Sequence, residues 1–139
     1  MIKYMLDTDI CSYIMREKPL EVLRHFDTLK MEQFSISIIT YAEFMYGIEN
    51  SLNSKKHRFT VEKFILHVDI LPWDQSAAKH YGQIRAELQK KGNSIGAMDM
   101  MIAGHARSIK RTLVTNNEKH FSRVSNLKIE NWISSPVRY

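Results

Sequence analysis

Residues 2–8 have the sequence IKYMLDT, a short apolar run that ends at the carboxylate of Asp7. Such a run predicts a buried strand, and the following residues, 8–16, predict a helix. Asp7 would then lie at the carboxyl end of a strand, where open α/β sheets place their ligands. A second interpretation is that Asp7 or Thr8 only caps the helix by accepting hydrogen bonds from its first free N–H groups.

Two further acids occur where an apolar side chain is expected. Glu43 follows a strand-like run at 35–39, although Thr40 to Glu43 also fits the capping box of a helix start. Asp99 shares a helix face with small apolar residues such as Ala103, although the dipole of a helix that starts nearby would also attract an acid. An ionised carboxylate is costly to remove from water without a partner. Inward-facing acids at all three positions therefore indicate a compensating cation, of which a divalent metal is the simplest.

The remaining pattern alternates strands with helices. Strands are predicted at 2–6, 35–39, 69–71, 112–115 and 127–130, and helices at 8–16, 20–26, 41–51, 55–67, 75–91, 97–108 and 118–121. This alternation predicts a single α/β domain over residues 1–139, in which a mainly parallel central sheet is flanked by helices as an α/β/α sandwich. Each of the three acids adjoins a strand end or a helix start, so we expect them to converge on one edge of the sheet.

Composition excludes several classes of protein. Hydrophobic residues make up 44% and charged residues 25% of the 139 residues, which is typical of a globular domain rather than a disordered chain. The uncharged run at 34–42 is far shorter than the ~20 residues that cross a bilayer, and the N-terminus has no signal-peptide core. We therefore expect a cytoplasmic protein with no membrane partner. Cys11 is the only cysteine, so it cannot form an internal disulfide and is expected to be a small buried hydrophobe.

The net charge is +5 and the pI is about 9.4, which favours a polyanionic partner such as nucleic acid. The basic residues gather at 55–58, 85–91, 107–111 and 119–123, although any one such cluster is more often just a solvated helix face. A basic protein with an acidic pocket suits an enzyme that holds a phosphate backbone with cations while its carboxylates hold a metal.

Several stretches match a known family in order and spacing. They are MLDT at 5–8, ITYAE at 39–43, GQIRAEL at 82–88, DMMIAGHA at 99–106, LVTNN at 113–117 and HF at 120–121. Over essentially the whole chain, these residues resemble the PIN-domain ribonucleases, and among them the VapC toxins of bacterial toxin–antitoxin pairs. The resemblance implies that Asp7, Glu43 and Asp99 bind metal and are catalytic. It also implies that Thr8 and Thr115 help to position the site.

The chain departs from the family pattern at two positions. Many PIN domains carry a fourth acid where this chain has Asn117, so a second metal would be bound weakly, or Glu118 would substitute through water. Asp9 stands where relatives usually have Asn or Ser, and it is either an extra outer-shell acid, a natural variant or an engineered substitution. If Asp9 points into the pocket, its charge would raise the pKa of the neighbouring carboxylates when metal is absent.

The resemblance implies hydrolysis of an RNA phosphodiester with Mg²⁺ as the cofactor, or Mn²⁺ in its place, because carboxylate and water oxygens suit these ions. The products would carry a 5′-phosphate and a 3′-hydroxyl, and the expected substrate is a structured RNA such as the anticodon stem-loop of a tRNA. Arg85, Lys91 and Arg107 are the expected contacts to the RNA backbone.

The resemblance also implies partners. A cognate VapB-type antitoxin would lay its C-terminal segment across the helices near the site and insert an Arg or Lys among the acids. The toxin itself would be a homodimer, and its hetero-oligomer with the antitoxin would bind operator DNA. The alternative from a different class is a non-catalytic module that binds RNA or protein and uses the acids only to cap helices.

Overall fold

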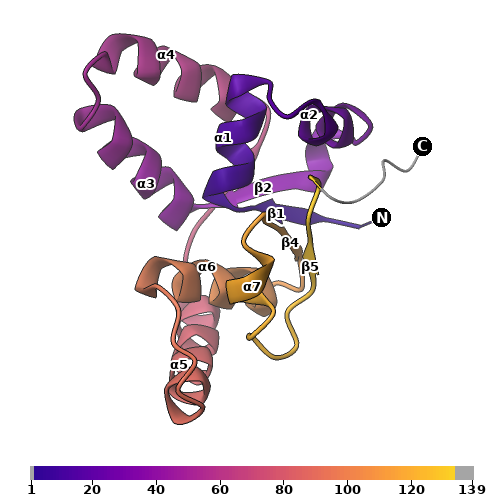
Figure 1. The fold of residues 1–139 in the computed structure, drawn as a ribbon, viewed down its shortest axis with the longest axis vertical. Coiled ribbons are helices and arrows are strands. Elements are labelled where there is room, and N and C mark those ends of the chain that lie inside the picture. The colour runs from indigo at the N-terminus through magenta and orange to yellow at the C-terminus, as the bar shows by residue number, and fades with distance from the viewer. Residues whose placement is uncertain (1, 134–139) are drawn as a thin grey trace.

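The computed structural model describes residues 2–133, and the predicted limits of the domain, 1–139, extend beyond them. Figure 1 shows the order of the elements along the chain. The strands are β1 (Tyr4–Leu6), β2 (Phe34–Ser37), β3 (Asp69–Leu71), β4 (Thr112–Val114) and β5 (Ile129–Glu130). The helices are α1 (Thr8–Arg16), α2 (Leu20–Asp27), α3 (Ile38–Glu49), α4 (Ser54–Ile65), α5 (Gln75–Lys90), α6 (Ala97–Ser108) and α7 (Glu118–Phe121), and Met31–Gln33 forms a 3₁₀ turn that the sequence did not predict.

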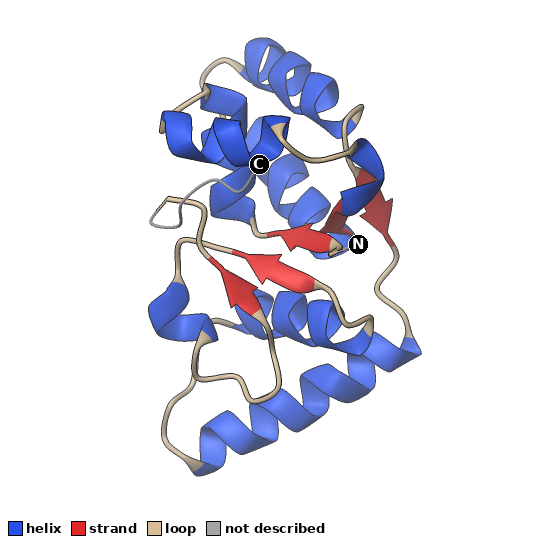
Figure 2. Cartoon of the chain, turned by 90° about the vertical axis from the view of Figure 1, so that its right-hand side faces the viewer, coloured by secondary structure: helices blue, strands red, loops and turns tan. Residues whose placement is uncertain are grey.

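The five strands form one parallel sheet in the order β3-β2-β1-β4-β5. In β1, Met5 pairs with Ser35 of β2 on one side and with Leu113 of β4 on the other. Figure 2 shows the sheet between two helical layers, with α1 to α4 on one face and α5 and α6 on the other. The predicted α/β/α architecture is therefore confirmed.

The sheet separates two apolar clusters, because successive side chains of a strand point to opposite faces. Tyr4 and Leu6 of β1 pack with the layer of α1 to α4, whereas Met5 between them packs with α5 and α6. Leu6 and Met5 are fully buried. Cys11 is also fully buried, as expected of a small hydrophobe.

The start of α3 differs from the predicted one. We expected β2 to continue to residue 39 and the helix to begin at residue 41, because consecutive isoleucines are typical of a strand. Instead β2 ends at Ser37, whose hydroxyl accepts a hydrogen bond from the N–H of Ile39 (3.1 Å) and so caps a helix that begins at Ile38. The interpretation of Thr40 to Glu43 as a capping box is therefore wrong.

The predicted limits of α5 and α6 agree with the structure to within one residue, whereas β1 and β5 are each two residues shorter than predicted at their starts. Asp74 caps α5 by accepting a hydrogen bond from the N–H of Ala77 (3.0 Å), and Gly92 follows this helix with a positive φ of 67°. The helix over 97–108 has the predicted limits. Among the described residues, no helix has the length and apolar character that crossing a membrane requires.

The crossing of α5 and α6 depends on the absence of a side chain at Gly104. A Cβ at this position would lie 2.8 Å from the backbone nitrogen of Tyr81 and 3.2 Å from the carbonyl oxygen of Ala77. Real Cβ atoms do not approach backbone this closely, so the two helices would have to separate.

We therefore predict that Gly104→Ala lowers the free energy of unfolding by about 2 kcal/mol, the usual cost of overpacking. The melting temperature should fall by roughly 6 °C in a circular-dichroism melt. Gly82→Ala is the matched control, because Gly82 lies within α5 and a Cβ added to it would meet nothing within 4 Å. The control should leave stability unchanged or raise it by up to ~1 kcal/mol through helix propensity. Equal destabilisation by both substitutions would contradict this account of the crossing.

Candidate active site

Asp7 lies at the carboxyl edge of the sheet, where β1 and β4 run side by side. Its N–H donates to the carbonyl oxygen of Val114 (2.9 Å), which continues the strand pairing beyond Leu6. Its carboxylate accepts two further hydrogen bonds, from the N–H of Thr8 to Oδ1 (2.9 Å) and from the hydroxyl of Thr115 to Oδ2 (2.8 Å). Asp7 therefore lies at the carboxyl end of β1, as predicted, where it caps α1 and also accepts a hydrogen bond from Thr115, the residue that follows β4.

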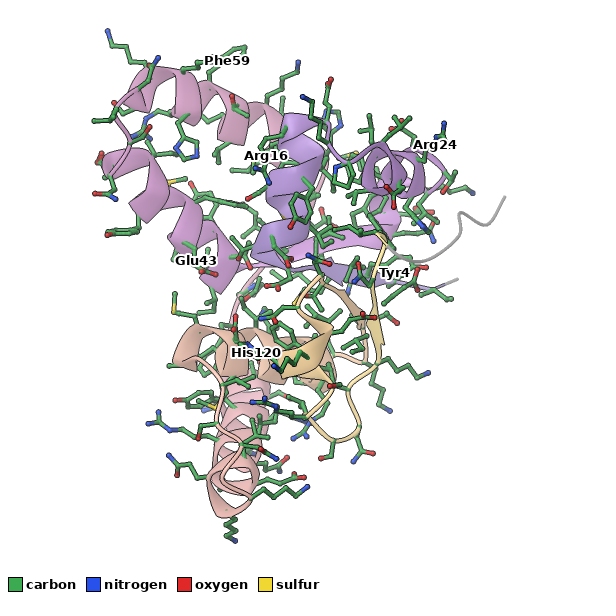
Figure 3. All side chains as sticks on the ribbon, in the orientation of Figure 1. Tyr4, Arg16, Arg24, Glu43, Phe59 and His120 are labelled. Atoms are coloured by element: carbon green, nitrogen blue, oxygen red, sulfur yellow. The ribbon has the colours of Figure 1, made fainter. Side chains whose placement is uncertain are left out.

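Glu43 reaches the same edge from α3. The hydroxyl of Thr8 donates to its Oε1 (2.8 Å), which joins the first turns of α3 to the first residue of α1. In Figure 3, Glu43 lies on the part of α3 that is nearest to α6 and α7. Glu43 does not cap its own helix, because Ser37 does so.

Asp99 comes from the first turn of α6, on the opposite layer of the molecule. Ile102 and Ala103 on the same helix are fully buried, as the sequence pattern predicted, while Asp99 itself is only half-buried. Its negative charge raises the pKa of Asp7 and of Glu43, so the three acids lie within electrostatic range of one another. The N-cap residue of α6 is Gly96, which has no side chain that could accept a hydrogen bond. Asp99 is therefore not the capping residue of this helix.

The supporting residues fix the loop that follows β4. Asp9 accepts hydrogen bonds from the N–H groups of Ile10 (2.7 Å) and Asn116 (3.1 Å), which tie α1 to this loop. The N–H of Asn117 donates to the hydroxyl of Thr115 (2.9 Å). Glu118 is exposed at the first position of α7. Thr8 and Thr115 thus contact Asp7 directly, Asp9 and Asn117 bind to the adjoining loop, and Glu118 is exposed and makes no side-chain hydrogen bond with the described residues.

Burial dominates the electrostatics of these acids. It raises the pKa of Asp7 from 3.8 to about 7, with a further increase from the charge of Asp9, while the hydrogen bonds from Thr115 and Thr8 oppose the increase. Burial is also the main reason why the pKa values of Asp9, Glu43 and Asp99 are raised. The charge of Asp9 acts on Asp7 in the direction that the sequence predicted.

No basic side chain neutralises this group through an ion pair within the described chain. Across residues 2–133 the one ion pair joins Lys91 to Glu87 on α5, remote in sequence from the acids. The charge of His120 on α7 lowers the pKa of Asp99. The Nδ2 of Asn117 lies 2.9 Å from the Nδ1 of His120. A group of acids that forms no ion pair with a described residue suits an external cation.

The donor set fits a hard divalent ion. Asp7, Glu43 and Asp99 offer carboxylate oxygens only, and Mg²⁺ binds through one or two carboxylates while keeping several waters. In the described part of the chain, no three His, Cys, Asp or Glu side chains already lie close enough to hold one ion together. The residues present therefore suit an ion that takes most of its ligands from water and substrate.

The three basic residues expected to contact RNA lie on or beside α5 and α6 and already have protein partners. Arg85 donates to the hydroxyl of Tyr81 (2.6 Å), and Lys91 pairs with Glu87 (3.0 Å). The guanidinium of Arg107 binds α5 and the loop after α7 through His80, Gln83 and the carbonyl oxygen of Ser125. The structure does not bring them to the acids.

Sequence reasoning assigned no role to two residues that the structure places at this edge. Asn116 donates its N–H to Asp9 and its Nδ2 to the hydroxyl of Tyr13 (3.4 Å). His120 lies beside Asp99 and is drawn in Figure 3 on α7. Their position in the sequence could have identified them, because both Asn116 and His120 closely follow the strand that ends at the site.

Comparisons with known proteins agree with this geometry. The PIN domain model matches residues 4–127. The chain is 43% identical to the tRNA(fMet)-specific endonuclease VapC of Shigella flexneri over 95% of this chain and 99% of that protein. It is 42% identical to Ribonuclease VapC2 of Haemophilus influenzae over 96% and 100% of the two chains.

Two solved structures are similar throughout. The chain superposes on the VapBC complex of Salmonella typhimurium bound to DNA with a TM-score of 0.89 and 42% identity, covering 95% of this chain and 99% of that one. It superposes on VapBC2 of Rickettsia felis, bound to a DNA fragment from its promoter, with a TM-score of 0.87 and 36% identity, again over 95% and 99%.

The raised pKa of Asp7 predicts how stability depends on pH without metal. Between pH 3.8 and about 7 the folded state holds a proton that the unfolded state has lost, so rising pH destabilises the fold through this window. Asp7→Asn removes this effect, which has an upper limit of about 4 kcal/mol. It also loses an acceptor, at a cost of about 1 kcal/mol, because one of the two oxygens that accept from Thr8 and Thr115 becomes an NH₂ group.

In melts with EDTA, the variant should therefore be slightly less stable than wild type at pH 4 and more stable at pH 8. Millimolar Mg²⁺ at pH 8 should stabilise wild type and leave the variant unchanged, since ligand binding to the folded state raises its stability. A difference between the two proteins that stays constant from pH 4 to pH 8 would show that Asp7 does not titrate in this way.

Proposed function

The chain belongs to the PIN-domain family and, within it, to the VapC ribonucleases, and from this premise we propose that it is a Mg²⁺-dependent endoribonuclease toxin that cuts a structured RNA. The observation that carries the proposal is the gathering of Asp7, Glu43 and Asp99 from three separate elements, with no ion pair to any described residue. These three are the metal-binding and catalytic residues, and Mn²⁺ is the alternative ion.

The hydroxyls and the backbone orient the acids. Thr115 and the N–H of Thr8 hold both oxygens of Asp7, and the Thr8 hydroxyl holds one oxygen of Glu43, which leaves its other oxygen available to a ligand. Mg²⁺, when bound there, would supply a more acidic water and would neutralise negative charge on the leaving oxygen. Because burial keeps Asp7 partly protonated near neutral pH, cation binding should release a proton from it.

Hydrolysis at such a site requires no nucleophilic side chain. Cys11 is fully buried, and burial holds the pKa of its thiol well above the usual value, so it is inert. The carboxylates would hold the ion, which would supply the attacking water, and the products would carry a 5′-phosphate and a 3′-hydroxyl. Asp9, Asn117 and Glu118 support the site, Asp9 by fixing the loop after β4 and Glu118 through water.

The proposed substrate is a tRNA, cut in its anticodon stem-loop. Relatives from Shigella flexneri and Salmonella typhimurium carry names that specify tRNA(fMet). The net charge of +5 favours binding of such a polyanion. Arg85 and Lys91 remain proposed backbone contacts, whereas Arg107 could contact RNA only by giving up hydrogen bonds that join α5 to α6.

The proposed partner is a cognate VapB-type antitoxin. Solved complexes of relatives combine VapB with VapC, and some of them are bound to DNA. We propose that the antitoxin inserts an Arg or Lys among the acids, which lack a basic neighbour of their own within the described residues, and that a homodimer of this chain forms an operator-binding assembly with it. The non-catalytic alternative is disfavoured because neither Glu43 nor Asp99 caps a helix.

The substitution Asp99→Asn tests the catalytic proposal. It should lower the rate of tRNA cleavage by at least about 100-fold, because it removes a charged ligand of the metal while preserving shape. The measurement is single-turnover cleavage with mapping of fragment ends, in Mg²⁺, in Mn²⁺ and in EDTA, and EDTA should abolish the wild-type activity.

The matched control is Glu62→Gln, which makes the same chemical change at an exposed acid of α4 and should retain full activity. A fully active Asp99→Asn protein would overturn the site assignment. Wild-type cleavage that persists in EDTA would overturn the metal dependence.

A further inference from the structure

Three neighbouring strands each begin directly after a cation, at the edge of the sheet opposite the acids. Lys3 precedes β1, Arg111 precedes β4 and Lys128 precedes β5. The N–H of Thr112 donates to the carbonyl oxygen of Lys3 (3.1 Å), and the N–H of Leu113 donates to that of Lys128 (2.9 Å). The pairing of the strands therefore places these three basic residues side by side, as Figure 1 shows for the starts of β1, β4 and β5.

These residues line a cleft of about 650 Å³, which we name the basic cleft. Its charged lining residues are Lys3, Lys110, Arg111 and Lys128, and none of its other lining residues carries a charge. A smaller hollow of about 160 Å³ adjoins it, shares Lys110, Arg111 and Lys128, and adds Arg107. The cleft thus concentrates positive charge without a carboxylate in its wall.

The guanidinium of Arg111 is fixed by hydrogen bonds that use only one of its nitrogens. Its Nη1 donates to the hydroxyl of Ser35 (3.1 Å) and to the carbonyl oxygen of Tyr4 (3.4 Å), which fixes the half-buried guanidinium against the sheet. Among the described residues, no hydrogen bond uses its Nε or Nη2. Asp69 on β3 balances part of its charge but does not line the cleft. A fixed guanidinium with free N–H groups suits a phosphate oxygen pair.

The end of α6 does not account for this charge. A helix C-terminus carries the equivalent of about half a negative charge, which attracts cations in its last turn. Lys110 lies just beyond α6, but Lys3 and Lys128 adjoin strands and lie in the last turn of no helix. The cleft therefore holds more positive charge than the helix end requires.

We propose that the basic cleft binds phosphate groups of the RNA backbone, on a part of the substrate remote from the bond that is cut. The proposal rests on the function proposed above. Lys3 and Asp7 are separated along β1 by about 13 Å at the rise of a strand, with the sheet between them. A mononucleotide cannot span this separation, whereas a folded RNA presents phosphates on several sides. The cleft would thus favour a large structured RNA over a short oligonucleotide.

The test compares two double variants with the same change in net charge. Lys110→Glu with Lys128→Glu alters the basic cleft, and Lys55→Glu with Lys56→Glu alters exposed residues of α4 as the control. Binding of fluorescent tRNA is measured in EDTA, so that no cleavage occurs. The cleft variant should bind at least about tenfold more weakly, and the slope of log affinity against log salt should fall by about two, while the control stays close to wild type.

Four further measurements decide the outcome. Melting curves must show that both variants fold, and Lys110→Gln with Lys128→Gln should give a weaker loss in the same direction. For the active enzyme in Mg²⁺, the cleft variant should raise KM for tRNA and leave kcat on a short stem-loop unchanged. NMR titration with inorganic phosphate reports whether the cleft binds a small anion.

Equal weakening by the cleft and control variants would overturn the proposal. Loss of inorganic phosphate binding with unchanged tRNA affinity would identify a small-anion site and would also overturn the assignment to RNA. Weakened tRNA binding in a protein that never cleaves RNA would support the cleft and refute the catalytic proposal, so the two failures are distinguishable.

Discussion

The site depends on crowding carboxylates at one edge of the sheet, where burial disfavours their charged form. The fold holds Asp7 there through the N–H of Thr8 and the hydroxyl of Thr115, and it holds Glu43 through the hydroxyl of Thr8. The parallel pairing of β1 with β4 brings Thr115 to Asp7, although they are far apart in the sequence. Because no described basic residue forms an ion pair with these acids, their negative charge must be relieved by protonation, as the raised pKa of Asp7 shows, or by an external cation.

The two edges of the sheet carry opposite charge. The carboxyl ends of the strands lead into the acids, and the amino ends of β1, β4 and β5 follow Lys3, Arg111 and Lys128. The surplus of +5 is therefore not spread evenly, since Asp7, Glu43 and Asp99 gather at the carboxyl ends of the strands and the cations of the basic cleft lie at the amino ends. Such a molecule can attract a polyanion overall although acids gather at one end of its strands.

The location of the acids within the fold followed from the sequence more closely than the ends of the elements around them. Asp7 at a strand end and Asp99 on the buried face of its helix were both visible as acids in apolar patterns. The start of α3 was missed because Ile38 and Ile39 resemble a strand, whereas the deciding feature is the side-chain cap at Ser37.

Contacts between distant segments could not be read from sequence spacing. The threonine bonds to Asp7 and Glu43 depend on the strand order, which the alternation of strands and helices does not fix. The partners of Arg107 likewise appear only when α5 lies against α6. The most direct test of the central claim is anomalous diffraction from crystals grown with Mn²⁺. We predict a Mn²⁺ peak in contact with the carboxylates of Asp7 and Asp99. A structure with bound Mn²⁺ only elsewhere, or with a lysine or arginine side chain filling the pocket of the free protein, would contradict the claim.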